Sequence, residues 1–418
     1  MQGNRAPSSL AQRLYGPVVS AAGLTAARAL TQAGVFISAV AVARSLGPGS
    51  FGKYSFVLSL AALTAGGLGA GLPVLAIRET AAGRGGAELN GRLLLSQLVA
   101  TGVGTVALGL VGYLFLGGTG GMIEGLLAGA VYIGFSMVTL GSSVQAGRQR
   151  YLRPVLGESV TGIACASFTI ASLSLGLGVL GAIASLAIGT VVGISVLWWD
   201  VPLSLTVGAR AVADSLRQAT PFLALGILSA GYLRIDTVVL GLVASQSTVG
   251  IYSAAYRILG PFALLLSGFG TVFYSRLSMG GRSAVAWHRV RRQARALLLA
   301  TLVPLLIAGF LAAPWLIDRV YGQSFGSALL PTRILLCSVI PLALYWPAAH
   351  ALNAAGRERT WTLLLAALMA TDASLVVLLG HILGATGAAL AWLIAESLLL
   401  ILISPIAHRL KVPAASAG

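Results

Sequence analysis

Six charged residues stand inside long apolar stretches of this sequence, where a charge is costly to bury. They are Arg28, Arg234, Asp236, Arg257, Asp372 and Glu396. A guanidinium group offers a rigid fork of donors that matches phosphate oxygens. The arginines therefore predict a binding site for an anionic group. The acids predict counter-charges for those arginines or a site that binds a small cation.

The stretch GYLRIDTVVLGL, residues 231–242, holds Arg234 and Asp236 together. Residues two apart on a helix point about 200° apart and do not pair as neighbours. At least one of these charges needs another partner, unless Gly231 lets the helix deform. Two interpretations stay open. Either the charges form bridges to other helices, or the arginines line a polar interior that the acids balance or gate.

The composition places these residues in a membrane. The chain of 418 residues is 57% hydrophobic and 9% charged, with a mean hydropathy of +0.91, whereas a soluble globular protein carries about 25% charged residues. We therefore expect a polytopic membrane protein. The net charge of +16 comes from arginines scattered between apolar runs, which argues against nucleic acid as a partner. Cys165 and Cys337 lack metal-ligand spacing, so no metal site is expected.

Twelve apolar runs are long enough to cross a bilayer, since one helical span needs about 20 mostly apolar residues. Backbone polar groups in lipid must be satisfied within the segment, which favours helices, and the runs are too long for barrel strands. We expect an all-α protein of about 12 transmembrane helices. The spans lie near 18–43, 54–77, 93–116, 122–141, 154–176, 179–198, 222–243, 250–272, 296–317, 329–352, 361–383 and 385–406.

The distribution of Arg and Lys predicts the topology, because cytoplasmic loops are enriched in both. Alternate loops and the two chain ends hold most of them, and the loop 276–295 is the most basic. The opposite loops hold only Arg44, Lys53 and Arg319. We therefore expect a multi-pass protein of the inner (plasma) membrane with both termini in the cytoplasm.

Three pairs of short segments repeat in the same order at similar spacing. They are GKYSF (52–56) with GIYSA (250–254), AGRQRYL (146–152) with AGRERTW (355–361), and LGAIASLA (180–187) with LGATGAAL (383–390). Six spans per half is an even number, so the halves should be related by a pseudo-two-fold axis along the membrane normal. We predict two six-helix bundles, an N-terminal lobe 1–205 and a C-terminal lobe 206–418. This plan favours a transporter over an enzyme.

The repeat also predicts where the charges lie. At about 1.5 Å per residue, Arg28 and Arg234 fall deep in the first span of each half, so we expect them to face each other across a lumen. Arg257 falls about 10 Å into its span from the outer side. Glu124 and Glu158 fall close to span ends, where we expect their side chains to snorkel to the surface.

Several longer motifs resemble one known family over nearly the whole chain. The most specific are LGPGSFGKYSF in the first half, and RIDTVVLG and VGIYSAAYR in the second. These segments resemble the polysaccharide transport family of the multidrug/oligosaccharidyl-lipid/polysaccharide exporter superfamily, which includes the O-antigen flippases.

The resemblance implies movement of a polyprenyl-diphosphate-linked oligosaccharide from the cytoplasmic to the outer leaflet by alternating access. The product would serve the biosynthesis of lipopolysaccharide O-antigen or another surface polysaccharide, beside a polysaccharide polymerase and glycosyltransferases. Arg28, Arg234 and Arg257 are then candidates for binding the diphosphate. The acids Asp236, Asp372 and Glu396 are candidates for coupling to an H⁺ or Na⁺ gradient or for counter-charge. No other cofactor is implied.

Two other functions compete with this one. A drug/cation antiporter of the same superfamily would need acids deep in its N-terminal half, and the first three spans contain none. A membrane-bound polysaccharide polymerase or ligase usually presents a sizeable external loop with catalytic Arg or His, whereas the connections here are short. A phosphate loop of the GxxxxGK[ST] kind is also missing from the sequence, which argues against ATP as the energy source. We therefore expect no enzyme.

Overall fold

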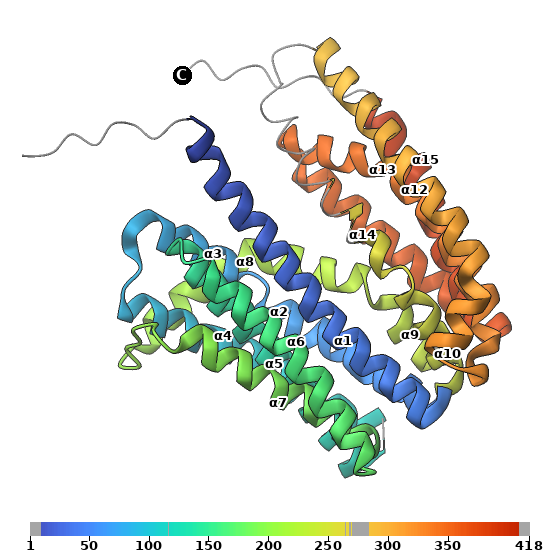
Figure 1. Ribbon diagram of the computed structural model, residues 1–418, viewed down its shortest axis with the longest axis horizontal. Helices are drawn as coiled ribbons and strands as arrows, with labels where there is room; N and C mark the ends of the chain where they lie inside the picture. Colours follow the sequence, from blue (N-terminus) through green and yellow to red (C-terminus); the bar gives the residue numbers. More distant parts are fainter. Residues whose placement is uncertain (1–9, 116, 264, 267–268, 270–283, 409–418) are drawn as a thin grey trace, which may run out of the picture. The chain divides into compact units, whose positions relative to one another are not determined.

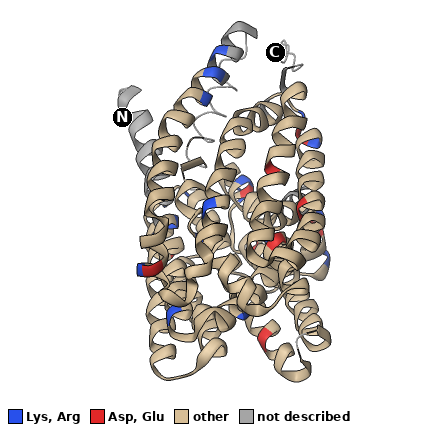
Figure 2. Ribbon diagram, turned by 90° about the vertical axis from the view of Figure 1, so that its right-hand side faces the viewer, with Lys and Arg blue, Asp and Glu red and all other residues tan. Residues whose placement is uncertain are grey.

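The computed structural model of the protein describes residues 10–115, 117–263, 265–266, 269 and 284–408. Every regular element within these ranges is a helix (Figure 1). Charged residues are sparse along the helices (Figure 2). Helices satisfy their own backbone hydrogen bonds, which is what an apolar chain in lipid requires. The all-α, polytopic class predicted from the composition is confirmed.

The helices follow one another with short connections. The first half contains α1 (Leu10–Ala61), α2 (Gly67–Gly69), α3 (Leu72–Glu79), α4 (Ala87–Phe115), α5 (Gly118–Gly147), α6 (Leu152–Ser174) and α7 (Gly178–Trp198). The second contains α8 (Ala209–Tyr232), α9 (Ile235–Val243), α10 (Gln246–Arg257), α12 (Ala284–Val320), α13 (Leu329–Ala354), α14 (Glu358–Leu375) and α15 (His381–His408). Short turns are π-helical at η1 (Ala62–Gly66), η2 (Thr80–Arg84) and η4 (Val376–Gly380), and 3₁₀-helical at η3 (Gln323–Ala328).

Eight helical stretches among the described residues are long and apolar enough to cross a membrane, or nine if the bent pair α8–α9 is one span. Two stretches each cover two predicted spans in whole or in part: Arg28–Arg84 with 57 residues, and Glu358–Ile406 with 49. Inside them the backbone turns left-handed at Gly47 (φ 75°) and Gly384 (φ 60°), where glycine is favoured. Both glycines lie at predicted boundaries between spans. The predicted span 250–272 runs into residues outside the described ranges.

The chain folds as two compact units. One unit is Met1–Ala41 with Thr64–Gly226, and the other is Val42–Leu63 with Ile227–Gly418. The lobes predicted from the sequence, 1–205 and 206–418, place residues 42–63 in the first half. In the structure these residues pack with the second half instead, because helix contacts rather than chain order define a unit.

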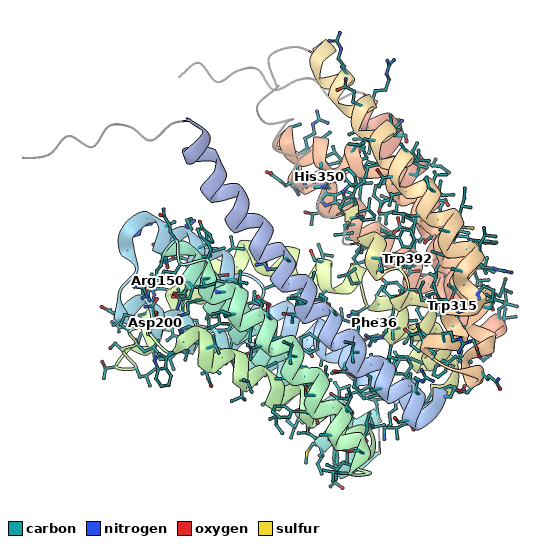
Figure 3. All side chains as sticks on the ribbon, in the orientation of Figure 1. Phe36, Arg150, Asp200, Trp315, His350 and Trp392 are labelled. Carbon is teal, nitrogen blue, oxygen red and sulfur yellow. The ribbon has the colours of Figure 1, made fainter. Side chains whose placement is uncertain are left out.

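In the first unit, α4 packs on α5 and α6 packs on α7. The indole N–H of Trp198 donates to the backbone oxygen of Met137 at 3.2 Å, which ties the end of α7 to α5. Just beyond, Arg150 forms an ion pair with Asp200 at 2.6 Å (Figure 3). A hydrogen bond from Gln145 and the neighbouring arginines lower the pKa of the Asp200 carboxyl group. The buried core includes Leu72, Leu93, Val138, Leu140 and Leu197.

In the second unit, α13 is central and packs against both α12 and α15. Trp315, near the end of α12, exposes 62% of its surface (Figure 3), as expected for a residue of the aromatic belt at a membrane interface. The buried core includes Tyr345, Leu352, Leu368, Leu399 and Ile403, with a second cluster around Leu302, Leu336 and Val339.

The repeated segments GKYSF and GIYSA cross each other within the second unit. A Cβ atom on Gly52 would overlap the backbone carbonyl of Gln246, and one on Gly250 would overlap that of Pro48. Tyr54 and Tyr252, two residues further along each segment, are both fully buried. Equivalent positions of the two halves therefore meet backbone to backbone, which supports the internal repeat seen in the sequence.

This crossing predicts the effect of one added methyl group. Gly52→Ala should destabilise the protein by about 1–3 kcal/mol, because the methyl group must displace backbone atoms rather than a flexible side chain. The melting temperature of the purified protein in detergent measures the effect. Gly49→Ala is the matched control, since nothing lies within 4 Å of a Cβ atom there. Equal melting temperatures for the two variants would contradict a tight crossing.

Candidate functional site

The stretch GYLRIDTVVLGL forms a broken helix. Helix α8 ends at Tyr232, α9 begins at Ile235, and the two helical segments are bent by 58°. The prediction of one continuous helix over 222–243 is therefore wrong, and the break lies beside Gly231, where the sequence left a deformation of the helix open. Gly231 packs against the side chain of Met369 with no room for a Cβ atom. Glycine lowers helix propensity, so Gly231 weakens helix continuity just before the break.

Asp236 is fully buried in the first turn of α9. Its carboxyl group accepts hydrogen bonds from the Tyr252 hydroxyl group and from the backbone N–H of Thr237, the latter at 2.5 Å. The Thr237 hydroxyl adds a third at 3.2 Å. Arg234 attracts this carboxyl group electrostatically. The two described side chains nevertheless form no direct ion pair, so Tyr252 on α10 is the close partner of Asp236.

Glu396 on α15 and Asp372 on α14 are also fully buried. The Tyr232 hydroxyl group donates to one oxygen of Glu396 at 2.8 Å. Among the described residues, none donates a hydrogen bond to the other Glu396 oxygen or to either oxygen of Asp372. The Tyr232 ring packs on Trp392, with centroids 5.1 Å apart, and Trp392 lies in the interior of this unit (Figure 3).

These three acids form one electrostatic group, which we call the carboxyl cluster (Asp236, Asp372 and Glu396). Asp372 interacts with both other carboxyl groups, and Arg234 is the cation that acts on Asp236. Buried acids thus outnumber the adjacent cation. The predicted counter-charge is present for Arg234, but the cluster holds more acid than one arginine can balance.

The other two candidate arginines lie elsewhere. Arg257, the last residue of α10, lies over the ring of Phe51 at 5.6 Å from its centroid, a distance at which a cation and an aromatic face attract. Arg28 is exposed on α1 and belongs to the other compact unit. Its expected position opposite Arg234 stays a prediction.

The sequence analysis missed a buried acid in the first unit. Glu158 on α6 is buried, and each of its side-chain oxygens accepts a hydrogen bond, from Ser142 of α5 and Thr31 of α1, both at 3.1 Å. The Thr31 hydroxyl group also lies 2.6 Å from the Glu158 backbone oxygen. Glu124 is buried as well. The expectation that both side chains snorkel to the surface is therefore wrong, because neighbouring helices cover them. In the sequence, the hydroxyl-bearing residues Thr31 of α1 and Ser142 of α5 were the signal that could have indicated hydrogen-bond donors for a buried acid.

Within the residues that the structure describes, no group of three or more His, Cys, Asp or Glu side chains is arranged to hold a metal ion.

Several solved structures share this fold, and they are described as a lipid II flippase and as transporters of the MOP superfamily. The chain matches the lipid II flippase MurJ in an inward closed conformation with a TM-score of 0.76 and 14% identity, covering 94% of this chain and 88% of that one. It matches an inward-facing multidrug resistance MATE family transporter of the MOP superfamily with a TM-score of 0.72 and 16% identity, covering 91% and 94%. A MOP superfamily transporter from Pyrococcus furiosus matches with a TM-score of 0.64 and 17% identity, covering 93% and 94%. The chain shares the fold of these three transporters.

The family follows from the sequence match. Residues 20–280 match the family described as polysaccharide biosynthesis protein, and the chain belongs to that family. No curated protein matches the chain. The resemblance to polysaccharide transporters drawn from the motifs is confirmed.

The partner of Asp236 can be tested by stability. Tyr252→Phe removes the hydrogen bond that the buried carboxyl group accepts, and should cost about 1–3 kcal/mol. The measurement is the melting temperature in detergent. Tyr256→Phe serves as control, because the described structure gives its hydroxyl group no hydrogen bond while its ring lies 6.0 Å from Trp392. A Tyr252→Phe protein as stable as the control would show that this hydrogen bond contributes nothing.

Proposed function

We propose that the protein is a flippase that moves a polyprenyl-diphosphate-linked oligosaccharide from the cytoplasmic to the outer leaflet for surface polysaccharide biosynthesis. One observation carries the proposal: Arg234, partly buried, caps a helix that is broken between two apolar segments. Membership of the polysaccharide biosynthesis family supports it, as does the fold shared with transporters.

The break gives Arg234 a role that a continuous helix would not. The start of α9 presents backbone N–H groups and the positive end of a helix dipole, and discontinuous helices in transporters use such ends to bind anionic groups. In our proposal the lipid tail stays in the bilayer while Arg28, Arg234 and Arg257 contact the diphosphate in turn. Alternating access of the two halves exposes the group to each side of the membrane.

The carboxyl cluster is the proposed coupling site. Its acids bind a cation from an H⁺ or Na⁺ gradient, and binding changes the charge beside Arg234. In this scheme the protein lies in the inner membrane with both termini in the cytoplasm. A polymerase and glycosyltransferases of O-antigen or related polysaccharide synthesis act before and after it, and the protein itself catalyses no covalent step.

A drug/cation antiporter is the second candidate, and two observations favour it. The carboxyl cluster holds more buried acid than the adjacent Arg234 balances, and Glu158 supplies a buried acid in the first unit. An excess of acid suits a cationic solute. Transport assays with lipid-linked oligosaccharide and with organic cations separate the two functions.

Loss of Arg234 tests the flippase. Arg234→Ala should reduce surface polysaccharide at least 10-fold, because one charge-assisted contact to phosphate contributes about 1.5–3 kcal/mol. Lipid-linked oligosaccharide should accumulate at the cytoplasmic face, as measured by extraction and leaflet-specific labelling. Arg292→Ala makes the same change of charge at an exposed position of α12 and should leave export intact. Full surface polysaccharide in Arg234→Ala cells with normal protein in the membrane would overturn the role of Arg234.

Coupling is tested separately at Asp236. Asp236→Asn keeps the shape of the side chain but removes the charge beside Arg234, so transport in vesicles should fall and its response to an imposed H⁺ or Na⁺ gradient should weaken. Asp318→Asn, at an exposed position of α12, is the control and should respond like the unmodified protein. An Asp236→Asn protein that keeps both the rate and the gradient response would remove Asp236 from the coupling site.

A further inference from the structure

Among the groups that the described structure shows acting on the carboxyl cluster, acids outnumber cations. The titratable and charged groups that interact there come from five stretches of helix. They are Tyr232, Arg234 and Asp236 of α8–α9, Tyr252 and Tyr256 of α10, Tyr345 of α13, Asp372 of α14 and Glu396 of α15. Three of these groups are acids and one is a permanent cation. If every acid were ionised, the buried group would carry two uncompensated negative charges.

The three acids have very different partners. Asp236 accepts three hydrogen bonds, lies in the first turn of α9 and is attracted by Arg234. Hydrogen bonds to the charged form, a helix N-terminus and a nearby cation all stabilise a carboxylate. Burial opposes the charged form of Asp236 as well, but of the three acids it is the one whose hydrogen bonds and neighbouring cation offset that cost.

Asp372 has the opposite environment. It is fully buried, no described residue donates a hydrogen bond to it, and its electrostatic neighbours are the other two acids. Burial and like charges both disfavour the ionised form. A protonated carboxyl group carries no net charge and is far less costly to bury than a carboxylate.

Glu396 is intermediate in hydrogen bonding but equally buried. The hydroxyl groups of Tyr232 and Tyr345 both act on this carboxyl group, while no described residue donates to Oε2. It acts electrostatically on Asp372, and no cation is among the groups that act on it in the described structure. An added proton would remove the repulsion between these two acids.

We propose that the carboxyl cluster binds two protons, one on Asp372 and one on Glu396, while Asp236 stays ionised opposite Arg234. This assignment makes the buried group electrically neutral, since the charges of Asp236 and Arg234 cancel and the other two acids carry none. The consequence of this assignment for transport rests on the proposed function. It makes that function more specific, because H⁺ becomes the coupling ion and Asp372 and Glu396 the groups that carry it. Release of both protons leaves two negative charges beside Arg234, which then compete with an anionic substrate for that side chain.

Infrared spectroscopy of the purified protein in lipid nanodiscs at neutral pH tests the assignment without substrate or gradient. Protonated carboxyl groups absorb at a C=O stretch that is distinct from that of carboxylates and shifts in D₂O. Asp372→Asn and Glu396→Gln should each remove the signal of one carboxylic acid, and the double variant should remove two. Asp318→Asn should remove none. Asn and Gln are neutral and similar in shape to the protonated acids, so the variants should fold.

A second pair of variants tests the ionised member. Arg234→Ala removes the cation, so the cluster should take up a third proton and gain one carboxylic acid signal. That gain should be absent in Arg234→Ala/Asp236→Asn. If a neutral variant fails to fold, Asp372→Glu and Glu396→Asp retain the acid and should shift its band rather than remove it.

Unchanged carboxylic acid signals in Asp372→Asn and Glu396→Gln would overturn the two-proton assignment, and loss from only one of them would also do so. A missing gain in Arg234→Ala would overturn the ionised state of Asp236. Because this readout needs no transport, a protein that holds two protons but moves no lipid-linked oligosaccharide would disprove the flippase while leaving the proton site intact.

Discussion

A charge buried among apolar helices must be compensated inside the protein, and this constraint organises the second unit. Asp236 accepts hydrogen bonds from Tyr252 and Thr237, and Glu396 accepts one from Tyr232. Each hydroxyl donor comes from a helix that also packs in the core, so electrostatic compensation and helix packing are set by the same residues. Asp372 is the exception, since no described residue donates to it. Buried ionisable groups that lack such hydrogen-bond donors are the first candidates for functional residues.

Much of this arrangement follows from local sequence. Apolar runs predicted the helices, and glycines at span boundaries coincide with the reversals at Gly47 and Gly384. Charges within those runs identified Asp236, Asp372 and Glu396, which all prove to be fully buried. These features depend on composition and on conformational freedom at single residues, which the sequence states directly.

Other features depend on residues far apart in the chain and could not be predicted from it. The helix break at Arg234 is linked to packing of Gly231 against Met369 on another helix. Burial of Glu158 requires Thr31 and Ser142 to arrive from two other helices. Spacing along one helix, the basis of the sequence argument, contains no information about such partners.

The unit boundaries have a mechanical consequence. The chain passes from one unit to the other between residues 41 and 42, 63 and 64, and 226 and 227. These positions fall inside α1, inside the π-helical turn η1 and inside α8, rather than in loops. Proteins commonly join moving bodies by flexible linkers, but here any displacement of one unit against the other must bend or twist a helix. Such motion would have to be absorbed within α1, η1 and α8 themselves, and π-helical turns such as η1 are among the known sites of helix bending.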